Sequence, residues 1–326
     1  MTYITHSIDY CLSGWEVIVT EWETDGDDTS EPGVINRDTL VERLAVVRHA
    51  SARAADTYVG HPVRGFVQRT FGGHLVAQSI LAATETVEYS DRVVNSLHCS
   101  FLRIGTHERP LEYTVSRIRD GRSFSVRETA VRQDGRELAR LSITFCTTAA
   151  HGTPSSSSVP LDVPAPDTLE PLHRRRALGL PADGIKLPAR EHWWTASRPV
   201  DIRYVDGTDD RTFWFRTAPA EGAPQNVHRA MLAFASDRSL LPVIGHARGD
   251  LETAHLMRTA SVDHALWFHA DVTAGRWFLY VQDSPFHTTR SGLARGSILG
   301  RDGELVATVM QQGLIVDDRP ARNSRS

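Results

Sequence analysis

The amino-acid sequence repeats its own pattern, and this repetition constrains the fold more than any other feature. Arg127 and Arg295 each stand seven residues before an Asp-Gly pair, and a strand-like segment containing Glu-Leu follows each pair. Upstream, the segment His98-Cys-Ser-Phe101 matches His264-Ala-Leu-Trp267. Several matches in the same order indicate that a helix-plus-sheet unit has been duplicated within the chain.

Hydrophobic patterning predicts one buried helix and a set of antiparallel strands in each half. Residues 74–87 are apolar or small on nearly every side, as in a buried helix, and residues 226–241 predict a second helix that ends before Pro242. A short helix is expected at 38–47. Segments rich in β-branched and aromatic residues predict strands at 93–102, 111–119, 123–133, 136–147, 201–205, 212–216, 261–269, 277–284, 292–300 and 304–316.

Length and composition suggest how these elements divide into domains. At roughly 150 residues per domain, 326 residues suggest two domains. We expect a first repeat at 37–148, a Ser- and Pro-rich linker at 149–195 and a second repeat at 196–318. Residues 1–36, with an acidic, turn-rich run, are expected to be an N-terminal extension, and 319–326 a tail.

Charge and motif content exclude several classes of protein. The net charge of -4 and the absence of a basic stripe argue against nucleic-acid binding. No apolar run reaches the roughly 18 residues that span a membrane, and Met1 to Cys11 lacks the order of a secretion signal. The three cysteines form no CxxC pair, so we expect reduced thiols in a cytoplasmic protein. Without HExxH, P-loop, GxGxxG or GxSxG motifs, we expect no metal ion and no organic cofactor.

Three residues of the second half are candidates for chemistry. Asp237 lies in a predicted buried helix, where a carboxylate is costly unless it is solvated, paired or used; a catalytic role and a structural role near the helix end are both open. Gln311 replaces, by the Asp-Gly register, the core residue Ile143 of the first half, an inconsistency that often marks a functional position.

Ser261 begins a segment, Ser-Val-Asp-His, that contains the residue types of a catalytic triad. Strict alternation along one strand puts Ser261 and Asp263 on one face and His264 on the other, which excludes a relay within the segment. We interpret Asp263 as a structural partner of the backbone. The predicted helix that carries Asp237 has no histidine close to that residue in sequence.

These segments together resemble the acyl-CoA thioesterase II family, the tandem-hotdog thioesterases, over roughly residues 37–318. The resemblance is carried by Phe71-Gly-Gly-His-Leu-Val-Ala-Gln78, Ser100-Phe-Leu-Arg103, Arg119-Asp-Gly-Arg-Ser-Phe-Ser125, Ala235-Ser-Asp237, Asp263-His-Ala-Leu-Trp-Phe-His269 and Gln311 with Gly313. It implies an α+β fold of two hotdog repeats, each with a long helix wrapped by a curved antiparallel sheet. It also implies a homo-oligomer.

The resemblance implies hydrolysis of an acyl-CoA substrate to a free fatty acid and CoA. Asp237, Ser261 and Gln311 match the family's catalytic Asp, Thr or Ser, and Gln. Asp237 would act as or assist the general base, while Ser261 and Gln311 would hold the water or polarise the carbonyl. Two alternatives remain: an acyl-CoA hydratase or dehydratase on the same fold, and a non-catalytic acyl-CoA binding protein.

Overall fold

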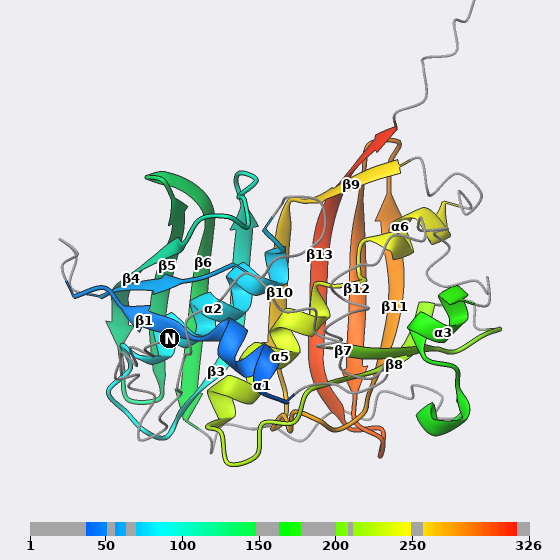
Figure 1. Cartoon of the computed structure of the whole chain (residues 1–326), viewed down its shortest axis with the longest axis horizontal. Coiled ribbons are helices and arrows are strands. Elements are labelled where there is room, and N and C mark those ends of the chain that lie inside the picture. Colours follow the sequence, from blue (N-terminus) through cyan, green and yellow to red (C-terminus); the bar gives the residue numbers. More distant parts are fainter. Residues whose placement is uncertain are drawn as a thin grey trace, which may run out of the picture.

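The fold is one antiparallel sheet that curves around two central helices (Figure 1). The computed structural model describes residues 37–50, 56–62, 70–147, 163–177, 200–207, 211–248 and 257–317. The expected extension 1–36, the tail 319–326 and most of the expected linker lie outside the described residues.

The first half contains two helices and six strands. They are α1 (Arg37–Leu44), β1 (Val46–Arg48), β2 (Thr57–Gly60), α2 (Gly72–Thr84), β3 (Arg92–Phe101), β4 (Leu111–Asp120), β5 (Phe124–Gln133) and β6 (Arg136–Thr147). The helix expected at 38–47 is too long, because the chain leaves α1 after Leu44 and enters β1. Neither β1 nor β2 was predicted.

The second half follows a short connecting region. That region includes η3 (Pro166–Thr168) and α3 (Leu172–Ala177), within the expected linker. The second half then contains β7 (Val200–Tyr204), β8 (Arg211–Thr217), α5 (Gln225–Ser236), α6 (Pro242–Ala247), β9 (Met257–Ser261), β10 (Asp263–Phe268), β11 (Phe278–His287), β12 (Ser291–Leu299) and β13 (Leu305–Asp317). The helix expected at 226–241 ends at Ser236, and Pro242 begins α6 instead.

Strand order confirms the duplication. The order is β1-β2-β4-β5-β6-β3-β10-β13-β12-β11-β8-β7, so the second half repeats the first in reverse from the central pair β3 and β10 outward. Those two strands carry the matched segments: His98 lies opposite Ala265, and His264 lies opposite Cys99. The two Asp-Gly pairs, Asp134-Gly135 and Asp302-Gly303, form the turns that join β5 to β6 and β12 to β13, with positive φ at Asp134, Gly135 and Gly303.

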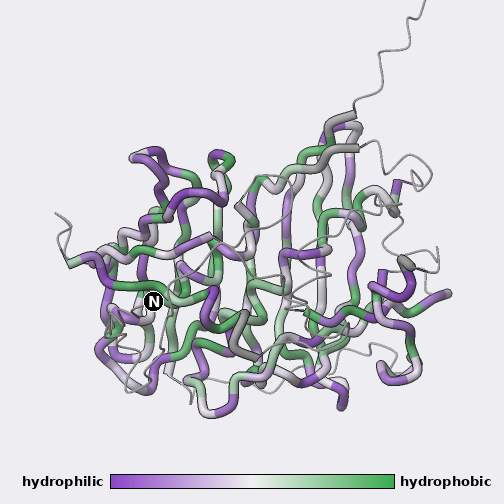
Figure 2. The backbone as a smooth tube through the Cα atoms, viewed as in Figure 1, coloured by the Kyte–Doolittle hydropathy of each residue, from purple (hydrophilic) through white to green (hydrophobic). Residues whose placement is uncertain are grey.

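Helices α2 and α5 pack against each other on the concave side of the sheet and form the core (Figure 1). Hydrophobic residues gather along these helices and the strands that they cover (Figure 2). A bulge in β3 leaves the backbone N–H and carbonyl of Val94 to be satisfied by α5: Asn226 Oδ1 accepts from the N–H at 2.9 Å, and Arg229 Nη1 donates to the carbonyl at 2.5 Å. The second half therefore completes backbone hydrogen bonding in the first half.

None of the described helices is long and apolar enough to span a membrane.

Candidate active site

Three elements of the second half bring the three predicted site residues together. Asp237 follows the last residue of α5, Ser261 ends β9, and Gln311 lies within β13. The amide nitrogen of Gln311 donates to Asp237 Oδ1 at 2.6 Å and to Ser261 Oγ at 2.8 Å. An amide nitrogen has two hydrogens, so Gln311 uses both to tie the carboxylate to the hydroxyl.

The first half supplies a fourth contact. Asp237 Oδ2 accepts a hydrogen bond of 2.7 Å from the backbone N–H of Gly73, in the first turn of α2. Phe71, at the N-cap of α2, provides no side-chain cap, so Asp237 takes that place across 164 positions of sequence. The first turn of a helix has unpaired N–H groups that point outward, so a side-chain acceptor in this place helps to complete the hydrogen bonding of α2.

Two glycines allow this close approach. A Cβ on Gly72 would lie 2.8 Å from Asp237 Oδ2, and one on Gly73 would lie 2.5 Å from the carbonyl oxygen of Phe234. The second contact is with the backbone of α5, which cannot move without moving the helix. The Gly-Gly pair is therefore needed for α2 to begin beside the end of α5.

A β-bulge places Ser261 and His264 on the same side of the sheet. Ser261 lies opposite Gly313 and Ala265 lies opposite Met310. The chain therefore advances four residues from β9 to β10 while β13 advances only three. The extra residue reverses the alternation between them. The prediction that His264 points away from Ser261 is therefore wrong, because it assumed one unbroken strand.

His264 was not predicted as part of the site, yet it lies within it. Its side chain is wholly buried, its Nδ1 lies 3.8 Å from Asp237 Oδ1, and its Nε2 lies 3.0 Å from Ser236 Oγ. Burial lowers the pKa of His264 below its ordinary value, and the nearby carboxylates of Asp237 and Asp263 oppose this shift only in part. The histidine beside Asp237 therefore comes from β10 and not from the helix that precedes Asp237.

Asp263 has the structural role that the sequence suggested. Its Oδ1 accepts a hydrogen bond of 2.7 Å from the backbone N–H of Gln312. Burial, with the charges of Asp237 and Asp263, raises the pKa of the Cys99 thiol well above its ordinary value, which keeps Cys99 neutral beside the site. Within the described ranges, no three His, Cys, Asp or Glu side chains gather as a metal site would require.

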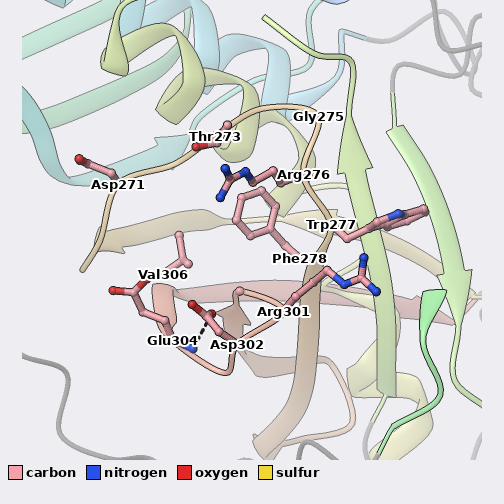
Figure 3. A pocket seen from close by; sticks show the side chains of 11 residues that line it. Asp271, Thr273, Gly275, Arg276, Trp277, Phe278, Arg301, Asp302, Glu304 and Val306 are labelled. Atoms are coloured by element: carbon pink, nitrogen blue, oxygen red, sulfur yellow. Dashed lines mark hydrogen bonds between the residues drawn. The ribbon is translucent and has the colours of Figure 1, made fainter. Parts of the chain in front are cut away.

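A separate surface cleft of about 460 Å³ lies at the start of β13 and the loop after β10 (Figure 3). Its lining includes Arg276 and Arg301 beside the acidic residues Asp271, Asp302 and Glu304. Neither Asp237, Ser261 nor Gln311 contributes to this lining. The mixed charges give the cleft no clear preference for an anion or a cation, and the chemistry is better placed at Asp237.

Comparison with known proteins gives a consistent result for both halves. A family model described as acyl-CoA thioesterase matches residues 189–314, and one described as the acyl-CoA thioesterase N-terminal domain matches residues 62–146. Acyl-coenzyme A thioesterase 8 of Mus musculus is 31% identical over 271 residues, covering 76% of this chain and 80% of the mouse protein. Acyl-CoA thioesterase 2 of Haemophilus influenzae is 30% identical over 262 residues, covering 77% of this chain and 88% of the Haemophilus protein.

Solved structures agree. An acyl-CoA thioesterase II from Mycobacterium marinum is 29% identical with a TM-score of 0.68, covering 86% of this chain and 99% of that one. A hotdog-fold protein from Alicyclobacillus acidocaldarius, 17% identical with a TM-score of 0.65, supports the fold alone and covers 86% of this chain and 97% of that one. The α+β tandem-hotdog prediction is confirmed, and the chain belongs to the acyl-CoA thioesterase family.

Proposed function

We propose that this protein hydrolyses acyl-CoA thioesters to a free fatty acid and CoA, with water activated by Asp237, Ser261 and Gln311. The observation that carries the proposal is the carboxylate of Asp237. Its side chain is only 4% exposed, and uncharged N–H groups of Gly73 and Gln311 hold its two oxygens. Such donors fix the carboxylate without neutralising it, so it stays able to take a proton from water.

The proposed reaction needs no covalent intermediate. Water attacks the thioester carbonyl while Asp237 takes one of its protons; the C–S bond then breaks, and the sulfur takes the proton that Asp237 holds. Ser261 Oγ accepts from Gln311, so its own hydrogen is available for the water or for the carbonyl oxygen. A hydroxyl without an adjacent base is a weak nucleophile, which argues against attack by Ser261 itself.

One observation favours the rival assignment to a hydratase or dehydratase, and another argues against it. Such enzymes use an Asp and a His that both reach the substrate, and His264 does lie near Asp237. However, the named relatives of both halves are acyl-CoA thioesterases. This favours the hydrolytic assignment over the rival.

The decisive variant is Asp237→Asn, assayed by release of CoA from acyl-CoAs of several chain lengths. An amide cannot accept the proton, so turnover should fall by about 100-fold or more. Asp283→Asn, which changes a carboxylate on β11 that pairs with Arg295 and, within the described part of the chain, is hydrogen-bonded to none of the three proposed residues, is the matched control and should keep its activity. Full turnover by Asp237→Asn would exclude the mechanism.

The same assay separates the alternatives. A hydratase would add water to an enoyl-CoA without releasing CoA, and a binding protein would retain acyl-CoA without turnover. Cytoplasmic location and homo-oligomeric assembly stay predictions; light scattering coupled to size-exclusion chromatography tests the second.

A further inference from the structure

His264 is the buried titratable group of the site that the mechanism above does not use. It projects from β10 between the end of α5 and β13, where Asp237 and Gln311 lie. Within this site, two buried side-chain atoms form no hydrogen bond to another described residue: His264 Nδ1 and Gln311 Oε1. A buried polar atom without a partner is costly, so both positions call for an explanation.

The hydrogens around Ser236 determine the tautomer of His264. Ser236 Oγ lies 2.9 Å from the carbonyl oxygen of Ala233, to which it donates its single hydrogen. It can then only accept from His264 Nε2, 3.0 Å away. The neutral ring therefore carries its hydrogen on Nε2, and Nδ1 presents a lone pair towards Asp237.

The separation between His264 Nδ1 and Asp237 Oδ1 fits one bridging water. At 3.8 Å the two atoms are too far apart for a direct hydrogen bond. Both are acceptors, so a molecule between them must donate to each, which water does with its two hydrogens.

We propose that His264 is a further catalytic residue, whose Nδ1 accepts the second hydrogen of the attacking water while Asp237 Oδ1 accepts the first. This inference rests on the proposed role of Asp237 as the base. The water oxygen keeps one lone pair for the hydroxyl of Ser261 and one for the carbonyl carbon. During attack the water hydrogen that is hydrogen-bonded to Asp237 Oδ1 transfers to that carboxylate. The water hydrogen that is hydrogen-bonded to His264 Nδ1 stays on the oxygen and becomes part of the new carboxylic acid.

Protonation of His264 would remove this function, because Nδ1–H is a donor. The ionisable groups that face the ring are Asp237 at the end of α5, Asp263 on its own strand and Cys99 opposite it on β3. Burial favours the neutral ring, whereas the two carboxylates and the Gln311 side chain favour the protonated ring; burial is the largest effect and keeps the pKa of His264 below its ordinary value. Activity should therefore be lost as pH falls through a value below about 6.5.

The first test uses the wild-type protein with ¹⁵N-labelled histidine. NMR should find His264 as the Nε2–H tautomer wherever the enzyme is active. The midpoint of its protonation should coincide with the acid limb of kcat. A ring that stays neutral across that limb, or one with its hydrogen on Nδ1, overturns the inference, and this outcome needs no variant to fold.

The second test is His264→Gln. Glutamine can place an N–H near the position of Nε2 and so keep the bond to Ser236, but it offers nothing at Nδ1. We expect kcat to fall about 10-fold, as for one lost hydrogen bond, with KM little changed and the acid limb moved to lower pH. The matched control is His269→Gln, because His269 also pairs with a hydroxyl, Thr308 Oγ1 at 2.9 Å, and burial also lowers its pKa.

Two comparisons make the result decisive. Ser236→Ala removes the acceptor that fixes the tautomer, so it should lower kcat while leaving the size of the ring's surroundings nearly unchanged. If Asp237→Asn is inactive while His264→Gln keeps the wild-type kcat and acid limb, only this inference fails. If Asp237→Asn retains full turnover, the proposed function itself fails.

Discussion

At the scale of single residues, the candidate site depends on the side-chain amide of Gln311 and on the extra residue of the bulge between Ser261 and Ala265. Gln311 was predictable, because an amide in place of Ile143 is visible when the two halves are aligned. His264 was not predictable, because its direction depends on the bulge between Ser261 and Ala265. Bulges arise from the pairing of two strands that are distant in sequence, so strict alternation along one segment cannot reveal them.

The hydroxyl of Ser261 can be tested at this scale. Ser261→Thr should keep most activity, because the hydroxyl survives and threonine suits a strand. Ser261→Ala should lose about 10- to 1,000-fold in kcat, the range expected when one positioned polar group is removed. Steady-state release of CoA measures both.

Mass spectrometry during turnover provides the check on mechanism. Because Gln311 donates to Ser261 Oγ and no base is paired with that oxygen among the described side chains, no acyl group should accumulate on Ser261. An acyl adduct trapped on this residue would contradict direct attack by water.

At the scale of elements, the ends of the helices were harder to predict than their existence. Apolar composition predicted both buried helices, and Pro242 gave an outer limit for the second. The helix ends earlier, at Ser236, where Asp237 caps α2 and the Ser236 hydroxyl meets Ala233 and His264. These contacts join residues far apart in sequence, and a local propensity contains no information about them.

Helix α2 also contains a buried histidine that should make stability depend on pH. Burial lowers the pKa of His74 to about 4, although its hydrogen bond with the His61 carbonyl opposes the shift. The unfolded chain takes up a proton below about pH 6.5 and the folded chain does not, so the free energy of unfolding decreases as pH falls from 6.5 towards 4. By pH 5 the loss from this group is roughly 2 kcal/mol.

His74→Gln should remove that part of the pH dependence. Denaturant unfolding of the variant and the wild type at pH 7 and pH 5 measures it. The control is His98→Gln, whose side chain lies on an exposed face of β3. Equal pH dependence in His74→Gln and the wild type would refute the assignment.

At the scale of the whole molecule, the repeat in the sequence predicted the architecture and its two-fold organisation. What it did not show is that the first half contributes directly to the site. The three predicted site residues all lie in the second half, yet Asp237 is held by Gly73 and β10 pairs with β3. The short strands β1 and β2 were also missed, because three or four residues are too few for periodicity to register.

The segment 190–318 alone should therefore be insoluble or molten and should not release CoA. It would expose the face of α5 that packs on α2, leave β10 with an unpaired edge and remove the Gly73 contact from Asp237. Co-expression with residues 37–148 as a separate polypeptide should restore soluble, active protein. A soluble fragment with full turnover on its own would show that the first half is dispensable.

The hydrogen bond from Gly73 to Asp237 also has a consequence for how the protein is made. Synthesis runs from the N-terminus, so the sequence of α2 leaves the ribosome long before the carboxylate that caps it. During that interval the first turn of α2 lacks its partner, and Gln311 is later still. A nascent or truncated chain that ends before Gln311 therefore lacks the proposed site.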